Sequence, residues 1–147
     1  MFMLRAEVEV RPTEDEGKVR KALRNLLSVN DDDIKAVDLG ENYKMLIVES
    51  RKIATLFKLY ELLRQERILD TARSIMYSSR RGEILTIKLH KQSAYAGHIS
   101  FISYDDESPL GPITITIVSD KLDEIIDWLA PRTSRGKPLW EREVPKV

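Results

Sequence analysis

The chain has 147 residues, 42% of them hydrophobic, and its 24 Lys and Arg balance 24 Asp and Glu. This length predicts one domain that buries about 70% of the surface exposed by its unfolded chain. The absence of cysteine excludes disulfides, thiolate metal sites and cysteine nucleophiles. No apolar run approaches the ~20 residues of a membrane span, so we expect a cytoplasmic protein with no membrane partner.

The balanced net charge hides an uneven distribution along the chain. Residues 51–98 carry 10 Lys and Arg against 4 Asp and Glu, whereas residues 1–50 and 99–147 each carry a net charge of −3. A basic segment between two acidic ones indicates an anionic partner more directly than the total charge does.

The N-terminal segment predicts a strand followed by a helix. Met3–Arg11 alternates apolar with polar side chains, which is the pattern of a half-buried strand. Pro12 ends this strand, and Thr13 with Glu16 makes the pattern of a capping box. The helix that follows carries an apolar stripe for the core and a basic stripe outside. These stripes are Val19, Ala22, Leu23, Leu26 and Leu27 in the first, and Lys18, Lys21 and Arg24 in the second.

Two strands and a long helical region come next. Ile34–Leu39 and Tyr43–Glu49 read as a strand pair joined by a short turn. Met45–Val48 is apolar on both faces, so we place the second strand inside the sheet. Arg51–Gln65 and Glu66–Ser79 are both helical by the spacing of their apolar residues, and the pattern leaves open whether a break separates them.

Three runs of period two follow these helices. Strict alternation gives each run one apolar face, and three such runs in succession predict an antiparallel sheet covered on one side. The runs are Leu85, Ile87 and Leu89, then Ile99 and Phe101, then Ile113, Ile115 and Ile117. We expect the six side chains of the first and last runs to point into one core.

The C-terminal part predicts one more helix and a tail. Ser119 or Asp120 is placed to cap a helix that ends before Pro131. From about residue 132 we expect an extended tail that Trp140 pins to the body. Because the chain shows no repeat and no low-complexity linker, residues 1–147 read as a single mixed α+β domain.

A first candidate site lies at the end of the long helical region. Arg73, Tyr77 and Arg80 or Arg81 follow one another at helical spacing, which sets guanidinium groups on either side of an aromatic ring. Such a ridge suits RNA phosphates and an unpaired base stacked on the ring. The alternative is a solvated helix face whose arginines satisfy the terminal carbonyls and pair with nearby acids.

A second candidate follows the strand Glu83–Leu89. Thr86, Lys88 and His90 share its polar face, and the loop beyond adds further polar side chains: Lys91, Gln92, Tyr95 and His98. Lys, His and Tyr side chains suit contacts to the RNA backbone and its 2′-hydroxyl groups. The alternative is an ordinary exposed connection.

The sequence gives less support to an enzymatic function. His90 and His98 with Asp105–Glu107 form a set of possible metal ligands, but no short histidine spacing accompanies them. Ser93 and Ser100 lack the turn motif of a nucleophilic serine. We therefore expect no catalytic residue, metal or cofactor.

Five segments that occur in order along the chain carry a family resemblance: Arg11–Asp15, Lys91–Ala94, Gly97 with Ile99–Phe101, Ser108–Ile113 and Asp127–Pro131. Together they resemble an uncharacterised family of small archaeal RNA-binding proteins. The resemblance covers nearly the whole chain and implies a fold similar to the large-subunit ribosomal protein that binds 5S rRNA. That fold is α+β, with a mostly antiparallel sheet and helices packed on one side. The family resemblance also implies a homodimer.

Three hypotheses of different classes follow. The first is a non-catalytic RNA-binding protein that contacts structured or ribosomal RNA through a basic surface from residues 51–98. The second is a dimeric protein-interaction module without affinity for nucleic acid, and the third is a metal-dependent hydrolase. For the first, the predicted contact residues are Arg73, Tyr77, Arg80, Arg81, Lys88, His90, Lys91 and Gln92.

Overall fold

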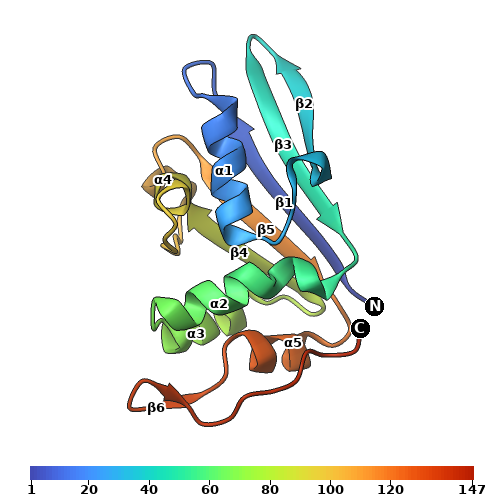
Figure 1. Cartoon of the computed structure of the whole chain (residues 1–147), viewed down its shortest axis with the longest axis vertical. Helices are drawn as coiled ribbons and strands as arrows, with labels where there is room; N and C mark the ends of the chain where they lie inside the picture. The colour runs from blue at the N-terminus through green and yellow to red at the C-terminus, as the bar shows by residue number, and fades with distance from the viewer.

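Alternating apolar residues build one five-stranded antiparallel sheet in the computed structural model, which describes residues 1–147 (Figure 1). The strands lie in the order β2-β3-β1-β5-β4, so the first strand of the chain is central. A separate two-stranded sheet joins β6 and β7. The bounds are β1 (Met3–Val10), β2 (Ile34–Gly40), β3 (Tyr43–Ser50), β4 (Ile84–His90), β5 (Pro112–Val118), β6 (Thr133–Ser134) and β7 (Lys137–Pro138).

The register aligns the apolar positions of three strands on one face. Ala6 of β1 lies opposite Ile115 of β5, which lies opposite Ile87 of β4. Each large aliphatic side chain that leaves water here contributes about 1.5–3 kcal/mol. The expectation of one shared core is confirmed for the six side chains of β4 and β5, which are 0% exposed: Leu85, Ile87, Leu89, Ile113, Ile115 and Ile117.

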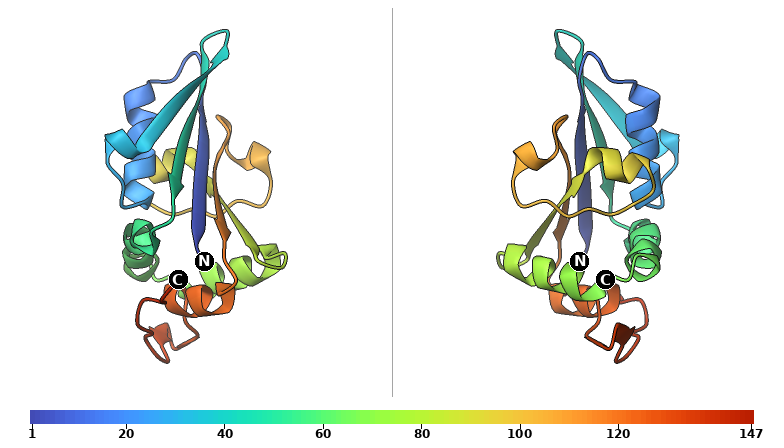
Figure 2. Two further views of the ribbon diagram at one scale, coloured as in Figure 1. Left: turned by 90° about the vertical axis from the view of Figure 1, so that its right-hand side faces the viewer. Right: turned by 90° about the vertical axis from the view of Figure 1, so that its left-hand side faces the viewer.

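Helices cover this apolar face of the sheet. Both views in Figure 2 place α1 and α2 on the same side of β1. The opposite face carries Arg5, Glu7 and Thr116 and stays open. The predicted mixed α+β class with an antiparallel sheet is therefore confirmed. The helices are α1 (Glu16–Leu26), α2 (Phe57–Gln65), α3 (Leu69–Ser79), α4 (Lys91–Tyr95) and α5 (Leu122–Leu129), and none is long and apolar enough to cross a membrane.

The strand pair β2–β3 has one inner and one edge member. β3 lies between β2 and β1, as its apolar run predicts, and Leu46 and Val48 are buried. In β2 only Ile34 is buried. The side chains of Val37 and Leu39 are 44% and 53% exposed. The edge strand therefore presents apolar side chains and an unpaired backbone edge to the surroundings.

The strand predicted at Ile99 and Phe101, the second of the three alternating runs, is wrong. Only an isolated bridge between Leu89 and Phe101 forms there, and α4 follows β4 directly. The His90 imidazole accepts a hydrogen bond from the N–H of Ser93, at 3.2 Å, which caps the short helix. The N–H of His90 donates to the carbonyl of Ser100 at 2.9 Å, and the N–H of Ile102 donates to the carbonyl of Lys88 at 3.0 Å. The chain between β4 and β5 therefore pairs with the end of β4 over a few residues and forms no strand.

The predicted capping residues of two helices are also wrong. At α1 the cap is Asp15, whose carboxylate accepts the N–H of Gly17 at 2.7 Å, because Asp15 lies two residues nearer the helix than Thr13. At α5 the cap position is Lys121, whose N–H donates to the Ser119 hydroxyl at 3.0 Å. A side chain two residues nearer the helix than expected therefore caps α1, whereas no side chain accepts the first N–H groups of α5.

The long helical region divides into three pieces. Residues Ile53–Leu56 form a 3-10 turn before α2, and α2 is separated from α3 near Arg67, whose φ of 56° lies in the left-handed region.

The segment that follows α5 contacts α2. Arg64 of α2 forms an ion pair with Glu141 of this segment at 2.7 Å, and its guanidinium carbon lies 3.4 Å from the centre of the Tyr60 ring. The C-terminal segment is thus fastened across α2.

Candidate nucleic-acid interface

The ridge predicted on α3 is held largely by contacts within the chain. Arg73 pairs with Asp127 at 2.9 Å and donates to the carbonyl of Ala130 at 3.0 Å, and its side chain is 15% exposed. Its guanidinium also lies 5.1 Å from the centre of the Tyr77 ring. Arg73 therefore joins α3 to α5, while Tyr77 remains at the surface.

Two arginines end α3 in different ways. Arg80 forms an ion pair with Asp123 and donates to the carbonyl of Gly82 at 2.9 Å. Arg81 is exposed and donates to the carbonyl of Ser78 at 2.8 Å and to that of Arg80 at 2.7 Å. No carboxylate lies within ion-pairing distance of Arg81, so its charge is not neutralised by an acid of the chain.

A hollow of about 420 Å³, lined mainly by polar residues, lies between α3 and β4. Arg81 and Lys88 both line it, and Lys88 pairs with Asp105 at 2.8 Å. The two cations therefore face one concave surface that is rich in hydrogen-bonding groups. Its hydroxyl groups belong to Ser78, Ser79, Thr86 and Ser103.

The remaining predicted residues surround the start of α4. Lys91 is 3% exposed, and its ammonium group contacts Glu14 at 2.9 Å, the carbonyl of Glu9 at 2.8 Å and the carbonyl of Leu110. Burial lowers the pKa of the Lys91 ammonium group, and the hydrogen bond to Glu14 opposes that shift. Lys91 thus faces inward, whereas the neighbouring Gln92 is exposed.

The basic surplus of residues 51–98 is partly neutralised by acids from the other two segments. Five cations of this segment form ion pairs with carboxylates, and all five carboxylates lie outside it. Charge counts along the sequence do not reveal these ion pairs, because the two members of each pair are far apart in the chain. The pairs are Arg64–Glu141, Arg73–Asp127, Arg80–Asp123, Lys88–Asp105 and Lys91–Glu14.

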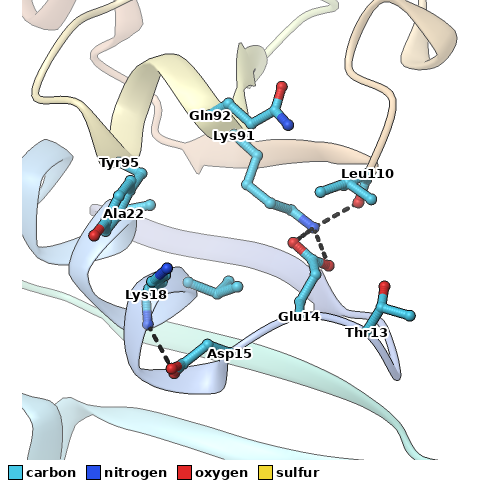
Figure 3. A pocket seen from close by; sticks show the side chains of 10 residues that line it. Thr13, Glu14, Asp15, Lys18, Ala22, Lys91, Gln92, Tyr95 and Leu110 are labelled. Carbon is cyan, nitrogen blue, oxygen red and sulfur yellow. Dashed lines mark hydrogen bonds and ion pairs between the residues drawn. The ribbon is translucent and has the colours of Figure 1, made fainter.

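A second cavity, of about 300 Å³, lies between α1 and α4 (Figure 3). The amide of Asn25 on α1 donates to the carbonyls of Ala94 and Tyr95, at 2.9 and 3.1 Å, and so fastens the end of α4 to α1. The Lys91–Glu14 pair forms part of the cavity lining. Lys18 and Tyr95 line the same cavity from α1 and α4.

Two lysines of α1 face the aromatic ring of α4. The ammonium nitrogens of Lys21 and Lys18 lie 5.3 and 6.0 Å from the centre of the Tyr95 ring, and neither lysine has an ion-pairing carboxylate. We call Lys18, Lys21, Gln92 and Tyr95 the Tyr95 site. Sequence reasoning identified the basic stripe and the tyrosine separately and missed that they meet. One signal was present, because Lys21 has no acid at four residues on either side.

The residues considered as metal ligands do not converge. No group of three or more His, Asp or Glu side chains is placed to hold a metal ion. His98 contacts Glu66 at 3.2 Å, and Glu107 accepts the N–H groups of Ser103 and Tyr104 at 2.6 and 2.7 Å. Those two hydrogen bonds lower the pKa of the Glu107 carboxyl group.

Sequence comparisons find relatives along nearly the whole chain. A family model described as RNA binding matches residues 3–119. A UPF0201 protein of Aeropyrum pernix is 48% identical over 141 residues, which cover 95% of this chain and 92% of that protein. A UPF0201 protein of Metallosphaera sedula is 45% identical over 138 residues, or 94% of each chain.

Solved structures match the fold. The crystal structure of a UPF0201 protein from Methanococcus jannaschii is 28% identical and superposes with a TM-score of 0.77, covering 93% of this chain and 98% of that one. A second UPF0201 crystal structure is 32% identical, with a TM-score of 0.72, covering 93% and 99% of the two chains.

Proposed function

The chain belongs to the archaeal UPF0201 family, and on this premise we propose that it is a non-catalytic RNA-binding protein of the cytoplasm. Its ligand is structured or ribosomal RNA, bound through the basic residues of the central segment. The observation that carries the proposal is the hollow between α3 and β4, where Arg81 and Lys88 meet four hydroxyl groups. A concave surface of cations and hydroxyl groups suits phosphate oxygens.

The contacts of these residues leave room for a phosphate. Arg81 is exposed and has no acid to displace. The Lys88–Asp105 pair is exposed on both sides, at 36% and 64%, and such pairs contribute about 0–1 kcal/mol, so a phosphate can replace Asp105. Tyr77, 41% exposed on α3, is available for stacking with a base. The assignment of the other predicted residues to RNA contact stays a prediction.

Filter binding of ribosomal RNA and of a hairpin RNA at several salt concentrations tests the proposal. We expect Arg81→Glu with Lys88→Glu to weaken binding to both RNAs and to flatten the dependence on salt, because phosphate contacts position the RNA without selecting its sequence. Arg132→Glu with Lys137→Glu beyond α5 is the matched control, because both residues are exposed and neither has a carboxylate within ion-pairing distance. Wild-type protein that binds neither RNA at low salt would refute the function.

We also propose that the chain forms a homodimer, the partner implied by the family resemblance. The edge strand β2 supports this, because Val37, Leu39 and an unpaired backbone edge are exposed there. Sedimentation equilibrium should give twice the monomer mass for the wild type, and Leu39→Lys should shift it toward the monomer. A monomer mass for the wild type across micromolar concentrations would exclude the dimer.

A further inference from the structure

The Tyr95 site presents an aromatic ring that the fold holds in place. Tyr95 is 38% exposed, so part of its ring is free for contact. The two hydrogen bonds from Asn25 to the backbone of α4 fix the segment that carries it. A pre-positioned ring loses little conformational entropy when a flat ligand stacks on it.

The cations of α1 are divided between two environments. Arg20 and Lys44 both bind Glu16, at 2.8 and 2.9 Å, and Arg24 pairs with Asp31. Lys18 and Lys21 have no such partner and gather beside Tyr95. The helix therefore directs its unneutralised charge toward the cavity.

The acidic side chains that line the cavity already have partners within the chain. Glu14 is neutralised by Lys91, and the Asp15 carboxylate accepts the N–H groups of Gly17 and Lys18. Lys18 is therefore the one unpaired cation among the lining residues, and the remaining lone pairs of these two carboxylates favour a donor over an anion. Apolar side chains complete the wall: Val19, Ala22 and Leu110.

From this arrangement we propose that the cavity between α1 and α4 binds one unpaired nucleotide of RNA. The base enters the cavity against Tyr95, and an exocyclic amino group, in the bases that carry one, points toward the carboxylate oxygens. The flanking phosphates lie outside, on Lys18 and Lys21. The proposal rests on RNA binding as the function and adds a base-binding site to the phosphate-binding hollow.

Gln92 completes the site at the rim. Its side chain is exposed and lines the cavity, and an amide both donates and accepts hydrogen bonds. Such a group contacts the edge of any base, so we expect the site to prefer unpaired RNA without strong sequence selection. Double-stranded RNA does not fit, because its bases are stacked inside the helix.

Two measurements separate this proposal from the function on which it rests. The first is an NMR titration of the ¹⁵N-labelled protein with millimolar adenosine monophosphate, with ribose 5-phosphate as the control that lacks a base. We expect adenosine monophosphate to shift the amide signals of Val19, Ala22 and Tyr95, and ribose 5-phosphate to leave them in place. Equal shifts with both ligands, or none, would overturn the base site whatever the affinity for RNA.

The second measurement is the binding of a single-stranded oligonucleotide to variants of the site. Tyr95→Ala should weaken binding about 5- to 150-fold, the range for loss of one stacked base, while the salt dependence is retained. Tyr95→Phe should keep most of the affinity, and both variants should show the wild-type far-ultraviolet circular dichroism. If RNA binding persists and Tyr95→Ala equals the wild type, the base site is refuted while RNA binding stands.

Discussion

With the exception of Arg81, the cations near the end of α3 and those of α1 beside Tyr95 differ in an unexpected way: the first are paired although their segment is basic, and the second are unpaired although their segment is acidic. Arg73, Arg80 and Lys88 come from the basic segment of residues 51–98, yet each is paired with an acid. Lys18 and Lys21 come from a segment with a net charge of −3, yet no carboxylate pairs with either. The local density of charge in a sequence therefore does not locate the free charge on the surface.

The reason lies in the distance between partners along the chain. A pair such as Arg20 and Glu16, four residues apart on one helix, is visible in the sequence. The acids that pair with the central segment come from elements that only the tertiary fold brings near. The unpaired cations can therefore be identified only from the tertiary structure. Variants of paired groups and variants of unpaired groups should differ in their effects on stability and on RNA binding.

The largest effect is expected from the most buried pair. Lys91→Met removes the partner of Glu14, whose side chain is 9% exposed, and leaves a carboxylate without its cation. Breaking a buried pair in this way costs about 3–5 kcal/mol of unfolding free energy, measured by urea denaturation. Gln92→Ala, at the exposed neighbouring position, should stay within about 0.5 kcal/mol of the wild type.

A double variant tests the cause of that loss. Lys91→Met with Glu14→Leu removes both charges, so we expect it to recover part of the stability. A double variant no more stable than Lys91→Met alone would show that the unpaired Glu14 carboxylate is not the cause of the loss.

Arg73 of α3 and Arg81 just beyond its end should contribute unequally to stability, and each should contribute less than Lys91. Arg73→Ala breaks a largely buried ion pair with Asp127 and a hydrogen bond to the carbonyl of Ala130, and should cost about 1–3 kcal/mol in the same denaturation experiment. Arg81→Ala removes only exposed contacts to carbonyls at the end of α3 and should cost less than about 1 kcal/mol. Equal losses for the two variants would contradict the distinction.

The unpaired lysines should affect RNA binding without affecting stability. Lys18→Ala with Lys21→Ala should flatten the log–log salt dependence of single-stranded RNA binding by about 1.4, at ~0.7 for each phosphate contact. Arg80→Ala should change that slope less, because Asp123 already neutralises this arginine. The reverse ranking of slopes would place the phosphates at the end of α3 instead.

The smallest effect concerns the paired acid of α1. Hydrogen bonds from Lys44 and then Arg20 lower the pKa of Glu16 from its usual 4.5. Because the pKa is lower in the folded state, Glu16 stabilises the protein above pH 4.5 and loses this contribution as the pH falls through the folded value. Glu16→Gln should therefore cost about 0.5 kcal/mol at neutral pH and progressively less in acid, by urea denaturation. A cost independent of pH would show that charge is not its origin.

Periodicity predicted the sheet well and the local turns poorly. The alternation in β4 and β5 predicted buried positions such as Ile87 and Ile115, because only one face of those strands meets the helices. The five residues of α4 are too few for a periodic signal, and a histidine side chain caps them. The family resemblance was confirmed by the relatives, but it carried no information on which side chains face solvent.

The sequence predicted the separate residues of the candidate site but not that they lie together. Tyr95 and Gln92 stood out in the sequence as polar residues in a loop, and the basic stripe of α1 stood out on its own. Their meeting depends on Asn25, which binds the backbone of α4 and gives no signal of that role. The burial of Lys91 likewise depends on Glu14, an acid from before α1.

The central position of β1 has a consequence for how the protein folds during synthesis. β1 and β3 can pair early, but the other edge of β1 receives β5 only much later, when Ile113 reaches Val8. Pairings so distant along the chain form slowly. Until then the nascent protein exposes an unpaired strand edge next to the apolar side chains Leu4, Ala6 and Val8. A chain interrupted before residue 112 would keep that edge permanently, which makes truncated products of this protein prone to aggregate.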